Sequence, residues 1–467
     1  MNFYPSYFDT TSVPTDPETT NNSCMWSDLD KSKTNGPILF EGTMARKKGK
    51  GNQLISSRTF KLVKGYLFFQ KSSSSKTQGG MINLEGVRLF AEHDGERLEG
   101  YPHSITLVMK NKYTTLYLTT REDLDNWMEA LTPYTIQTDF HFKYTLHKQI
   151  GKGGYSTVYL GQHNKSGKEV AVKVLTKETL RNKGVDASQL KYEIQAGWQS
   201  NHPNLLGVYE LHETQTSLYI IMELIKGQSL ISLLSGPNRR NLSFDETVKV
   251  IYQTLRGLKR LHSTGMMHRD IKPQNLMFKH PIETKDISDN VIKICDFGFA
   301  AQEKCGFKTP FVKCGTPGYV APEICSVKDD DGVYYGSPCD IFSLGVIFYY
   351  LLCGIFPFFA NSPSEIFARN ETEKIDLTVS GLKKYNQETR TLLEKMVATN
   401  PEERVTAQEA LRSPLFASLR RQSKEAQEEG TLSTCSSPTN SLSSESTQGS
   451  KGHTDQIEEP FSNELTS

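Results

Sequence analysis

Apolar and polar positions alternate in short runs along the first third of the chain, and turn residues separate these runs. Side chains alternate in Thr59–Leu62, and Lys64-Gly65 leads from there into the apolar run Tyr66–Phe69, a pattern that predicts a β-hairpin. Two further strands are expected at Ile105–Met109 and Tyr113–Leu118, with a short polar connection between them. This part of the chain is therefore expected to form a sheet of short strands.

An amphipathic helix is expected directly after these strands. Thr120 is a candidate N-cap. One face of the segment that follows carries apolar side chains at helical spacing, namely Leu124, Trp127, Met128 and Leu131. Several strands followed by one such helix predict a small barrel or sandwich that the helix closes.

Strands come first and helices dominate later between residues 142 and 419, an order that predicts a two-lobed α+β enzyme. Within this region, residues 341–364 carry no charged side chain and are long enough to suggest a membrane span. Gly354 and Pro357 interrupt the run near its end, so we expect a buried helix over Phe342–Cys353 that leads into a loop.

The two ends of the chain have compositions that disfavour a packed core. Residues 1–36 are rich in Thr, Ser, Asn, Asp and Pro, which predicts a disordered leader. Residues 420–467 are charged and then Ser/Thr-rich without apolar periodicity, so a disordered tail is expected. The first residues lack a basic segment followed by an apolar one, so no signal peptide is expected.

Composition also narrows the classes of function. A chain of 467 residues is expected to hold roughly two to three domains. The formal net charge is +1, which argues against nucleic acid as a partner. The eight cysteines form no C-x-x-C pair, which disfavours a zinc site and favours free thiols in a reducing cytosol.

A glycine-rich turn between two expected strands is the first candidate for chemistry. Glycine allows the backbone to approach phosphate oxygens and to point N–H groups at them. The motif alone is weak, because glycine-rich hairpins are common and its third glycine position is a serine. Its residues are Ile150, Gly151, Lys152, Gly153, Gly154, Tyr155, Ser156, Thr157 and Val158.

A lysine at the end of an apolar strand is the second candidate. Lys173 follows Val170–Val172, and such a lysine is ordinarily a side chain that extends to solvent from an edge strand. Here a helix with Glu193 follows, and its carboxylate could hold the ammonium group against the α- and β-phosphates of ATP. The two motifs together favour nucleotide binding.

The run His268–Leu276 carries the decisive polar residues. Asp270 can accept the proton of a substrate hydroxyl, and Lys272 can offset charge on a moving phosphoryl group. Asn275 has an amide oxygen suited to a metal ion, and Asp296, in Asp296-Phe297-Gly298, would chelate magnesium that bridges phosphates. A polar loop with no chemistry is no longer a reasonable interpretation once both motifs are present.

Ala321-Pro322-Glu323 completes the set, with Arg404 as the expected buried partner of Glu323. With these motifs in this order, residues 142–417 resemble the eukaryotic protein kinase family. The resemblance implies a kinase domain at 144–416, with a small lobe at 144–225 and a large lobe at 226–416. Its motif style is similar to the calcium/calmodulin-dependent kinases, on the Ser/Thr branch.

The resemblance implies ATP and Mg²⁺ as cofactors and proteins with Ser or Thr as substrates. It implies that Met222 is the gatekeeper, that the backbone of Glu223 and Ile225 binds adenine, and that Ala171 lines the same pocket. Basophilic members often carry acids where this chain has Ser229 and Gln274, so selection for a substrate arginine is expected to be weak.

The activation segment departs from the family pattern at one position. Val312 stands where an activating phosphothreonine is often found. The nearest hydroxyl upstream is on Thr309, which is therefore the candidate partner for Arg269 once phosphorylated. A loop that needs no phosphate is the alternative.

Residues 37–136 resemble a pleckstrin homology domain, opened by Glu41-Gly42, with Arg58–Leu62 as its second strand and Trp127 in its closing helix. The resemblance implies docking on phosphoinositide membranes. A stretch without acidic residues supports this, since it could bind inositol phosphates; its basic residues are Arg46, Lys47, Lys48, Lys50 and Arg58. Ser56 replaces one expected basic residue, and a protein-binding domain with a solvated loop is the alternative.

The expected fold is thus multi-domain: an N-terminal β-barrel or sandwich with a closing helix, then a two-lobed α+β kinase domain. We expect a cytoplasmic Ser/Thr kinase that is recruited peripherally to membranes. A pseudokinase scaffold is disfavoured because the polar motif residues are retained. A calmodulin site stays uncertain, because Arg420-Arg421 precede Glu425, Glu428 and Glu429.

Overall fold

The computed structural model describes a set of segments that together cover most of the chain before residue 423. They are residues 6–10, 27–28, 36–47, 55–69, 79–92, 98–109, 112–185, 187–198, 202–235, 239–282, 286–303, 313–327 and 335–422. Residues 1–417 form one compact unit, and residues 418–467 form a second, of which residues 418–422 are described and helical.

The N-terminal domain is built from two antiparallel meanders. The first runs through β2 (Phe40–Lys47), β3 (Ile55–Val63), β4 (Tyr66–Phe69) and β5 (Gly80–Asn83). The second runs through β6 (Arg88–Ala91), β7 (His103–Met109) and β8 (Lys112–Leu118), and β8 also pairs with β2. The predicted strands are confirmed here, although the connection at residues 110–111 lies outside the described residues.

The β3–β4 turn has the backbone that a two-residue hairpin requires. Lys64 and Gly65 have φ values of 46° and 81°. Positive φ at both central residues matches the right-handed twist of the flanking strands, and glycine adopts it without strain. The hairpin predicted at this dipeptide is confirmed.

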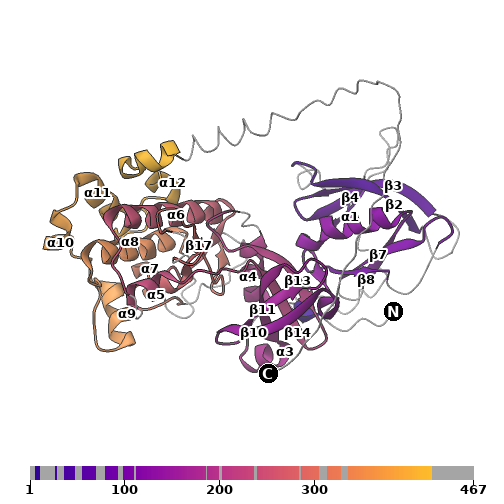
Figure 1. The fold of residues 1–467 in the computed structure, drawn as a ribbon, viewed down its shortest axis with the longest axis horizontal. Helices are drawn as coiled ribbons and strands as arrows, with labels where there is room; N and C mark the ends of the chain where they lie inside the picture. The colour runs from indigo at the N-terminus through magenta and orange to yellow at the C-terminus, as the bar shows by residue number, and fades with distance from the viewer. Residues whose placement is uncertain are drawn as a thin grey trace, which may run out of the picture. The chain divides into compact units, whose positions relative to one another are not determined.

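Helix α1 (Arg121–Leu131) closes the domain against β2, β7 and β8 (Figure 1). Its N-cap Thr120 accepts a hydrogen bond from the backbone N–H of Asp123, as expected for a first helical turn. Leu124, Trp127 and Leu131 are buried in the domain core, while Met128 is only partly buried. A short 3₁₀ turn, η3 (Thr132–Tyr134), follows the helix.

The close approach of the helix explains one glycine. A Cβ atom at Gly42 would lie 2.9 Å from the indole Nε1 of Trp127. Real Cβ contacts are essentially never that short, so the strand must carry glycine where the tryptophan crosses it. Phe40 packs edge-on against the same indole, with ring centroids 4.7 Å apart.

Parts of the predicted disordered leader are ordered, so that prediction is wrong for two segments. The 3₁₀ turn η1 (Tyr7–Thr10) packs on the small lobe, and β1 (Ser27–Asp28) pairs with β5. Both segments have partners far away in the sequence, which local composition does not reveal. The remaining leader residues before Gly36 lie outside the described residues.

The small lobe continues the chain with a mostly antiparallel sheet in the order β9-β13-β14-β12-β11-β10. Its strands are β9 (Ile136–Gln137), β10 (Tyr144–Lys152), β11 (Thr157–His163), β12 (Glu169–Thr176), β13 (Val208–Glu213) and β14 (Ser217–Met222). Its helices are α2 (Phe140–Lys143), α3 (Lys177–Asn182) and α4 (Ala187–Trp198). Strand β9 is parallel to β6 and to β13, and so joins the two domains by main-chain pairing.

The large lobe is mainly helical (Figure 1). Its helices are α5 (Leu230–Ser235), α6 (Phe244–Ser263), α7 (Pro322–Cys325), α8 (Pro338–Cys353), α9 (Pro363–Thr372), α10 (Ser380–Lys383), α11 (Gln387–Met396) and α12 (Ala407–Ala410). The 3₁₀ turns η4 (Pro273–Asn275) and η5 (Pro414–Phe416) belong to it as well. Two short ladders join β15 (Met266–Met267) to β18 (Ala301–Gln302) and β16 (Leu276–Phe278) to β17 (Ile292–Ile294).

Helix α8 is the buried helix that the uncharged run predicts. It begins at Pro338, earlier than the expected Phe342, because Asp340 is accommodated within its first turn. Gly354 ends the helix with φ of 73°, the left-handed conformation typical of a residue after a helix C-terminus. In the part of the chain that the structure describes, no helix has both the length and the apolarity to cross a bilayer.

Candidate active site

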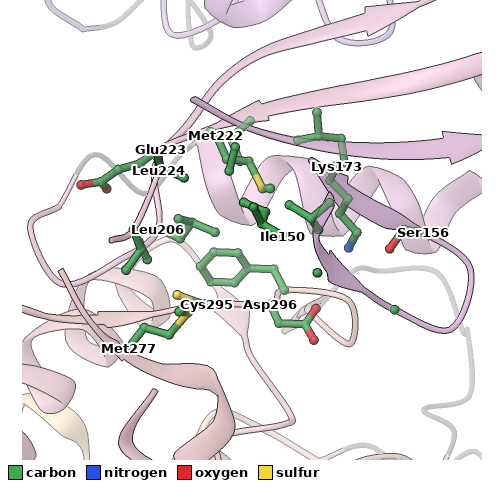
Figure 2. A pocket seen from close by; sticks show the side chains of 18 of the residues that line it. Ile150, Ser156, Lys173, Leu206, Met222, Glu223, Leu224, Met277, Cys295 and Asp296 are labelled. Atoms are coloured by element: carbon green, nitrogen blue, oxygen red, sulfur yellow. The ribbon is translucent and has the colours of Figure 1, made fainter. Parts of the chain in front are cut away.

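A cavity of about 360 Å³ opens beneath the β10–β11 turn and is bounded below by the segment around Asp296 (Figure 2). Most of the predicted nucleotide-binding residues line it: Ile150, Gly151, Lys152, Gly153, Ser156, Val158, Ala171, Lys173, Met222, Glu223 and Ile225. Gly154, Tyr155 and Thr157 belong to the predicted set but are not among the lining residues.

Part of the cavity wall is formed by residues that were not predicted from the sequence. These residues are mostly apolar and come from several strands and connections, namely Leu206, Val208, Ile220, Leu224, Met277, Cys295 and Phe297. An apolar side chain carries no motif by itself, so only sequence neighbours could have pointed to them. Cys295 directly precedes Asp296, and Met277, on β16, is two residues after Asn275. Both positions could therefore have been proposed from their neighbours in the motifs.

The glycine-rich turn is closed by its own backbone. The N–H of Gly153 donates to the carbonyl oxygen of Ser156 at 2.8 Å. A Cβ atom at Gly154 would meet nothing within 4 Å, so this residue borders open space. The ammonium group of Lys183, just after helix α3, donates to the carbonyl of Gly154. The turn is therefore held from two sides while its glycines leave room for a ligand.

Lys173 on β12 and Glu193 on α4 form a buried ion pair, as predicted. Their residues are 8% and 7% exposed. Burial opposes the charged form of Lys173, but attraction from Glu193 and then Asp296 outweighs it, so the pKa of Lys173 is raised. The ammonium group therefore stays charged. Figure 2 shows Lys173 and Asp296 projecting toward the cavity from opposite walls.

Tyr155 covers this ion pair. Its hydroxyl donates to Glu193 at 3.5 Å, and the Lys173 ammonium lies 5.7 Å from its ring centroid. Burial, followed by the Glu193 carboxylate, raises the pKa of Tyr155 to about 12. The phenol is consequently neutral and able to donate, although it lies outside the cavity lining.

Asp270 is 4% exposed and sits in a dense polar network. Its Oδ2 lies 2.7 Å from the Lys272 ammonium, and its Oδ1 accepts from the Thr316 hydroxyl at 2.6 Å. Lys272 also donates to the Thr316 hydroxyl oxygen at 2.8 Å. The three side chains form a closed triangle. Thr316 was missed as a site residue, although the run Gly315-Thr316-Pro317 was the signal that could have indicated it.

Asn275 is tied to the same loop. Its Nδ2 donates to the carbonyl oxygen of Asp270 at 2.8 Å and to Oδ2 of that residue at 3.2 Å. Both amide hydrogens are thus directed at Asp270, which orients the amide oxygen away from it. The carbonyl of Asn275 accepts from the N–H of Cys295 at 2.8 Å, so the backbone beside Asp296 is held next to Asn275.

The Asp296 segment has strained backbone and a packed aromatic residue. Asp296 has φ of 63°, a left-handed value that is uncommon outside glycine. Phe297 is 3% exposed and packs on the ring of His268, whose Nε2 donates to the carbonyl of Cys295 at 3.0 Å. Such strain persists only where surrounding contacts fix it, which favours a functional position for the carboxylate.

Asp340 at the start of α8 holds the Asp270 loop from below. Its Oδ2 accepts from the N–H of His268 and from His262 Nε2, both at 2.9 Å, and its Oδ1 accepts from the N–H of Arg269 at 2.8 Å. Burial raises the pKa of Asp340, but the hydrogen bond and charge of His262 outweigh burial and lower it. Arg269 itself has φ of 68°, and these bonds offset that strain.

A protein-family profile described as the protein kinase domain matches residues 144–416. The chain belongs to the protein kinase family. This kinase is 31% identical over 274 residues to calcium/calmodulin-dependent protein kinase type 1B of Homo sapiens, an alignment that covers 59% of this chain and 75% of the relative. It is 31% identical over 273 residues to a probable myosin light chain kinase of Dictyostelium discoideum, covering 58% and 82% of the two chains.

A probable serine/threonine-protein kinase of Dictyostelium discoideum is 30% identical over 292 residues, which cover 62% of this kinase and 47% of that relative. The chain therefore spans about half the length of that relative. The matches identify this kinase as a Ser/Thr protein kinase with the two-lobed α+β fold. They fall on the catalytic part of the chain.

The other predicted residues either do not line the cavity or lie outside the described residues. Ser229 directly precedes α5 and Gln274 lies in η4, two elements that contact each other. The Ser229 hydroxyl lies 2.8 Å from that of Ser232, and Gln274 is exposed. Arg46 is on β2 and Arg58 on β3 of the N-terminal domain. Lys47 ends β2, and nothing is described of its side chain; Lys48, Lys50, Thr309 and Val312 lie outside the described residues.

Proposed function

We propose that the kinase transfers the γ-phosphate of ATP to protein hydroxyls with the residues assembled around this cavity. Lys173, fixed by Glu193, binds the α- and β-phosphates, and the glycine-rich turn Ile150–Val158 covers them. Asp270 accepts the proton of the substrate hydroxyl, and Lys272 offsets charge on the transferred group. The observation that carries this proposal is the convergence of the Lys173–Glu193 pair and Asp296 on one cavity.

The apolar part of the cavity is proposed to hold the adenine ring. Met222 ends β14 as gatekeeper, and Ala171, which pairs with it across the sheet, forms the roof. The backbone of Glu223 and Ile225 would bind the edge of the ring. Glu223 is fixed from outside, because its Oε2 lies 2.5 Å from the buried Lys293 ammonium.

Mg²⁺ is the metal that the donor set fits. Asp296 offers a carboxylate and Asn275 an amide oxygen, the hard oxygen ligands that Mg²⁺ prefers alongside substrate phosphates. The bonds from the Asn275 amide hydrogens to Asp270 leave its oxygen free to face a cation. Bound there, the ion would neutralise phosphate charge during transfer.

We further propose that the N-terminal domain, residues 37–136, is a pleckstrin homology domain that docks the cytoplasmic kinase on phosphoinositide membranes. Its two meanders and closing helix support this assignment. Arg46 and Arg58 support the ligand: Arg58 pairs with Met44 across β2–β3, and Arg46 is two residues beyond Met44, so all three share one face.

The surroundings of the Arg58 guanidinium favour the binding of an anion. Its guanidinium carbon lies 4.8 Å from the Phe69 ring centroid, and its Nε donates to the Ser56 hydroxyl at 3.3 Å. Its Nη1 is buried, and no acceptor in the described segments lies within hydrogen-bond range of it. A buried donor without a partner costs free energy, which a phosphate oxygen would recover.

Liposome co-sedimentation of the full chain tests the membrane proposal. Binding to vesicles with phosphoinositide should exceed binding to vesicles without it and should weaken as salt rises, because such contacts are screened over about 8–10 Å. Arg46→Ala with Arg58→Ala should remove about 1 kcal/mol of binding free energy per residue. A control that removes two charges elsewhere in the hairpin, Lys61→Ala with Lys64→Asn, should bind as the wild type does.

Equal binding by the wild type and the Arg46/Arg58 variant, or no binding by either, would favour a protein-docking domain instead. The name of the human relative includes calmodulin dependence, which we do not propose for this chain. Three glutamates follow Arg420-Arg421, whereas calmodulin-binding helices are ordinarily basic and amphipathic.

A further inference from the structure

Ser6, Tyr7 and Phe8 are bound to the small lobe of the kinase, by contacts that reach as far as Glu213 in the sequence. The hydroxyl of Ser6 donates to Oε2 of Glu213 at 2.7 Å, and the backbone N–H of Tyr7 donates to Oε1 at 2.6 Å. Glu213 ends β13 and is 0% exposed. Its carboxylate therefore receives two hydrogen bonds from this one segment.

The same carboxylate also binds a buried lysine of the lobe. The ammonium group of Lys177, the first residue of α3, lies 2.8 Å from Oε1 of Glu213, and their side chains are 4% and 0% exposed. A buried ion pair is stable only when its remaining hydrogen-bonding positions are satisfied. Ser6 and Tyr7 supply donors to this pair from outside the lobe.

Aromatic side chains continue the contact. Tyr7 is 8% exposed, and its hydroxyl donates to the carbonyl oxygen of Val185 at 2.5 Å. Its ring packs in the apolar cluster that contains Leu190 and Ile194 of α4, and Phe8 packs against that cluster from its edge. The occupied groove thus lies between α3, α4 and the end of β13.

This groove adjoins the catalytic ion pair. Ile194 is the neighbour of Glu193 in α4, and Leu190 is three residues before Glu193, so both lie within one helical turn of it. The position of α4 decides whether Glu193 reaches Lys173 on β12. A side chain that packs on Leu190 and Ile194 therefore acts on the same helix that carries the carboxylate.

We propose that residues 6–8 form an activating segment: they occupy the groove between α3, α4 and β13 and hold α4 where Glu193 pairs with Lys173. Without the segment, Glu213 loses two donors and the apolar groove opens to water, so α4 is released from one of its fixed sides. This inference rests on the proposed role of the Lys173–Glu193 pair in phosphate binding.

The test compares the full-length wild type with Tyr7→Ala/Phe8→Ala and with Phe142→Ala, a control that also removes an aromatic ring from the small lobe but at an 88% exposed position. The double variant should lose about 5- to 150-fold in kcat/KM toward a peptide substrate, the usual range for coupling between two sites. Its α4 amides should exchange with deuterium faster than in the wild type. Phe142→Ala should match the wild type in both measurements.

Addition of a synthetic peptide of residues 1–12 supplies the second measurement. It should restore activity and α4 protection to the double variant, whereas the same peptide with Tyr7→Ala should not. Tyr7→Phe, which keeps the ring and removes the hydroxyl that donates to Val185, should give an intermediate loss. Wild-type activity and wild-type α4 exchange in a folded double variant would overturn the proposal, as would loss of activity that the peptide fails to restore.

The exchange and peptide measurements do not depend on the assignment of the chemistry. If the wild type failed to phosphorylate any Ser/Thr peptide, the proposed roles around the cavity would fail, yet α4 exchange would still report on the segment. If Lys173→Met abolished activity while the double variant kept it, the catalytic assignment would stand and the activating segment would be wrong.

Discussion

Arg404 and Glu323 form a buried two-point ion pair between segments 81 residues apart. The Arg404 Nη1 and Nη2 atoms donate to Oε1 and Oε2 of Glu323 at 2.6 and 2.7 Å. Further donation to the carbonyls of Ala398, Pro338 and Thr399 satisfies the three remaining guanidinium hydrogens, and the Arg404 side chain is 0% exposed. This parallel geometry gives a carboxylate its strongest pairing in proteins.

Removal of one partner should destabilise the large lobe strongly. Glu323→Ala leaves a buried guanidinium without its carboxylate, which costs about 3–5 kcal/mol of unfolding free energy. Denaturant unfolding followed by circular dichroism measures this. Arg369→Ala serves as the control, because it breaks an exposed pair with Glu373 at 3.7 Å and should cost less than about 1 kcal/mol. Similar losses in both variants would contradict the prediction.

The polar residues at the cavity should be required for turnover. Because Lys173→Met also leaves the buried Glu193 without its partner, the folding of each variant is checked. Asp270→Asn keeps the shape of the side chain but removes the negative charge that binds Lys272, and Lys173→Met removes the proposed phosphate contact. Each should reduce kcat by a factor equivalent to about 3 kcal/mol or more. Asp289→Asn, the same exchange at an exposed loop position, should leave kcat unchanged.

Phosphate transfer from labelled ATP to a peptide mixture measures this loss, with circular dichroism to check folding. Near-normal turnover in either folded variant, after a contaminant control, would remove the assigned role.

The motifs of the proposed active site could be recognised because each is a short run of polar residues at consecutive or nearby positions. The sequence alone is enough to recognise Asp270, Asn275 and Asp296. It also indicates the Glu323–Arg404 pair once the order of the motifs is known. Thr316 and the apolar wall, such as Leu206, could not be predicted in the same way. Their roles arise only where distant segments meet.

The ordered part of residues 1–36 could not be predicted from the sequence either, again because it depends on contacts between distant segments. Residues 1–36 have the composition of a chain that cannot form its own core, and that argument holds for an isolated segment. Tyr7 is ordered because the groove beside α4 supplies the apolar surface and Glu213 supplies the acceptor. The folding of such a segment depends on contacts with residues about two hundred positions away, which local composition does not contain.

His202 should make the kinase less stable at mildly acidic pH. Burial, then the charges of Arg256, Arg260 and Lys293, lowers the pKa of His202 to about 4 from 6.5. Its Nδ1 also accepts from the N–H of Asn204 at 3.1 Å, which requires the unprotonated ring nitrogen. Between these two pKa values the unfolded chain binds a proton that the folded chain does not, so stability falls as pH drops from 6.5 toward 4.

The effect should be roughly 1 kcal/mol, because the half-buried ring is partly screened by solvent. His202→Asn retains an acceptor without a titrating group, and its stability should depend less on pH over the same window. Thermal unfolding at a series of pH values compares the two proteins. Parallel pH profiles would show that other groups control acid stability.

Phosphorylation of Thr309 is the expected route to full activity if the activation segment needs an anion. Arg269 donates to the carbonyl of Phe299 at 2.6 Å and to the hydroxyl of Tyr335 at 3.0 Å, so its guanidinium contacts two described segments that come before and after Thr309 in the sequence. A phosphate would add charge-assisted bonds there. Mass spectrometry of active enzyme and the kinetics of Thr309→Ala measure this; unmodified Thr309 with full activity would exclude it.

Selection for an arginine upstream of the target Ser or Thr should be weak. Ser229 and Gln274 carry no charge, and the hydroxyl of Ser229, the residue before α5, lies 2.8 Å from that of Ser232. A substrate arginine therefore loses a charge-assisted contact worth roughly 1.5–3 kcal/mol.

A peptide array with the full-length kinase should show no dominant arginine upstream. The matched gain-of-function variant, Ser229→Asp with Gln274→Glu, should acquire that preference because both changes add negative charge. Aspartate can still accept the hydrogen bond that the N–H of Ser232 donates to the Ser229 hydroxyl at 3.3 Å. A strong arginine requirement in the wild type would mean that other acidic residues bind the substrate. A double variant without the new preference would mean that these two positions do not contact it.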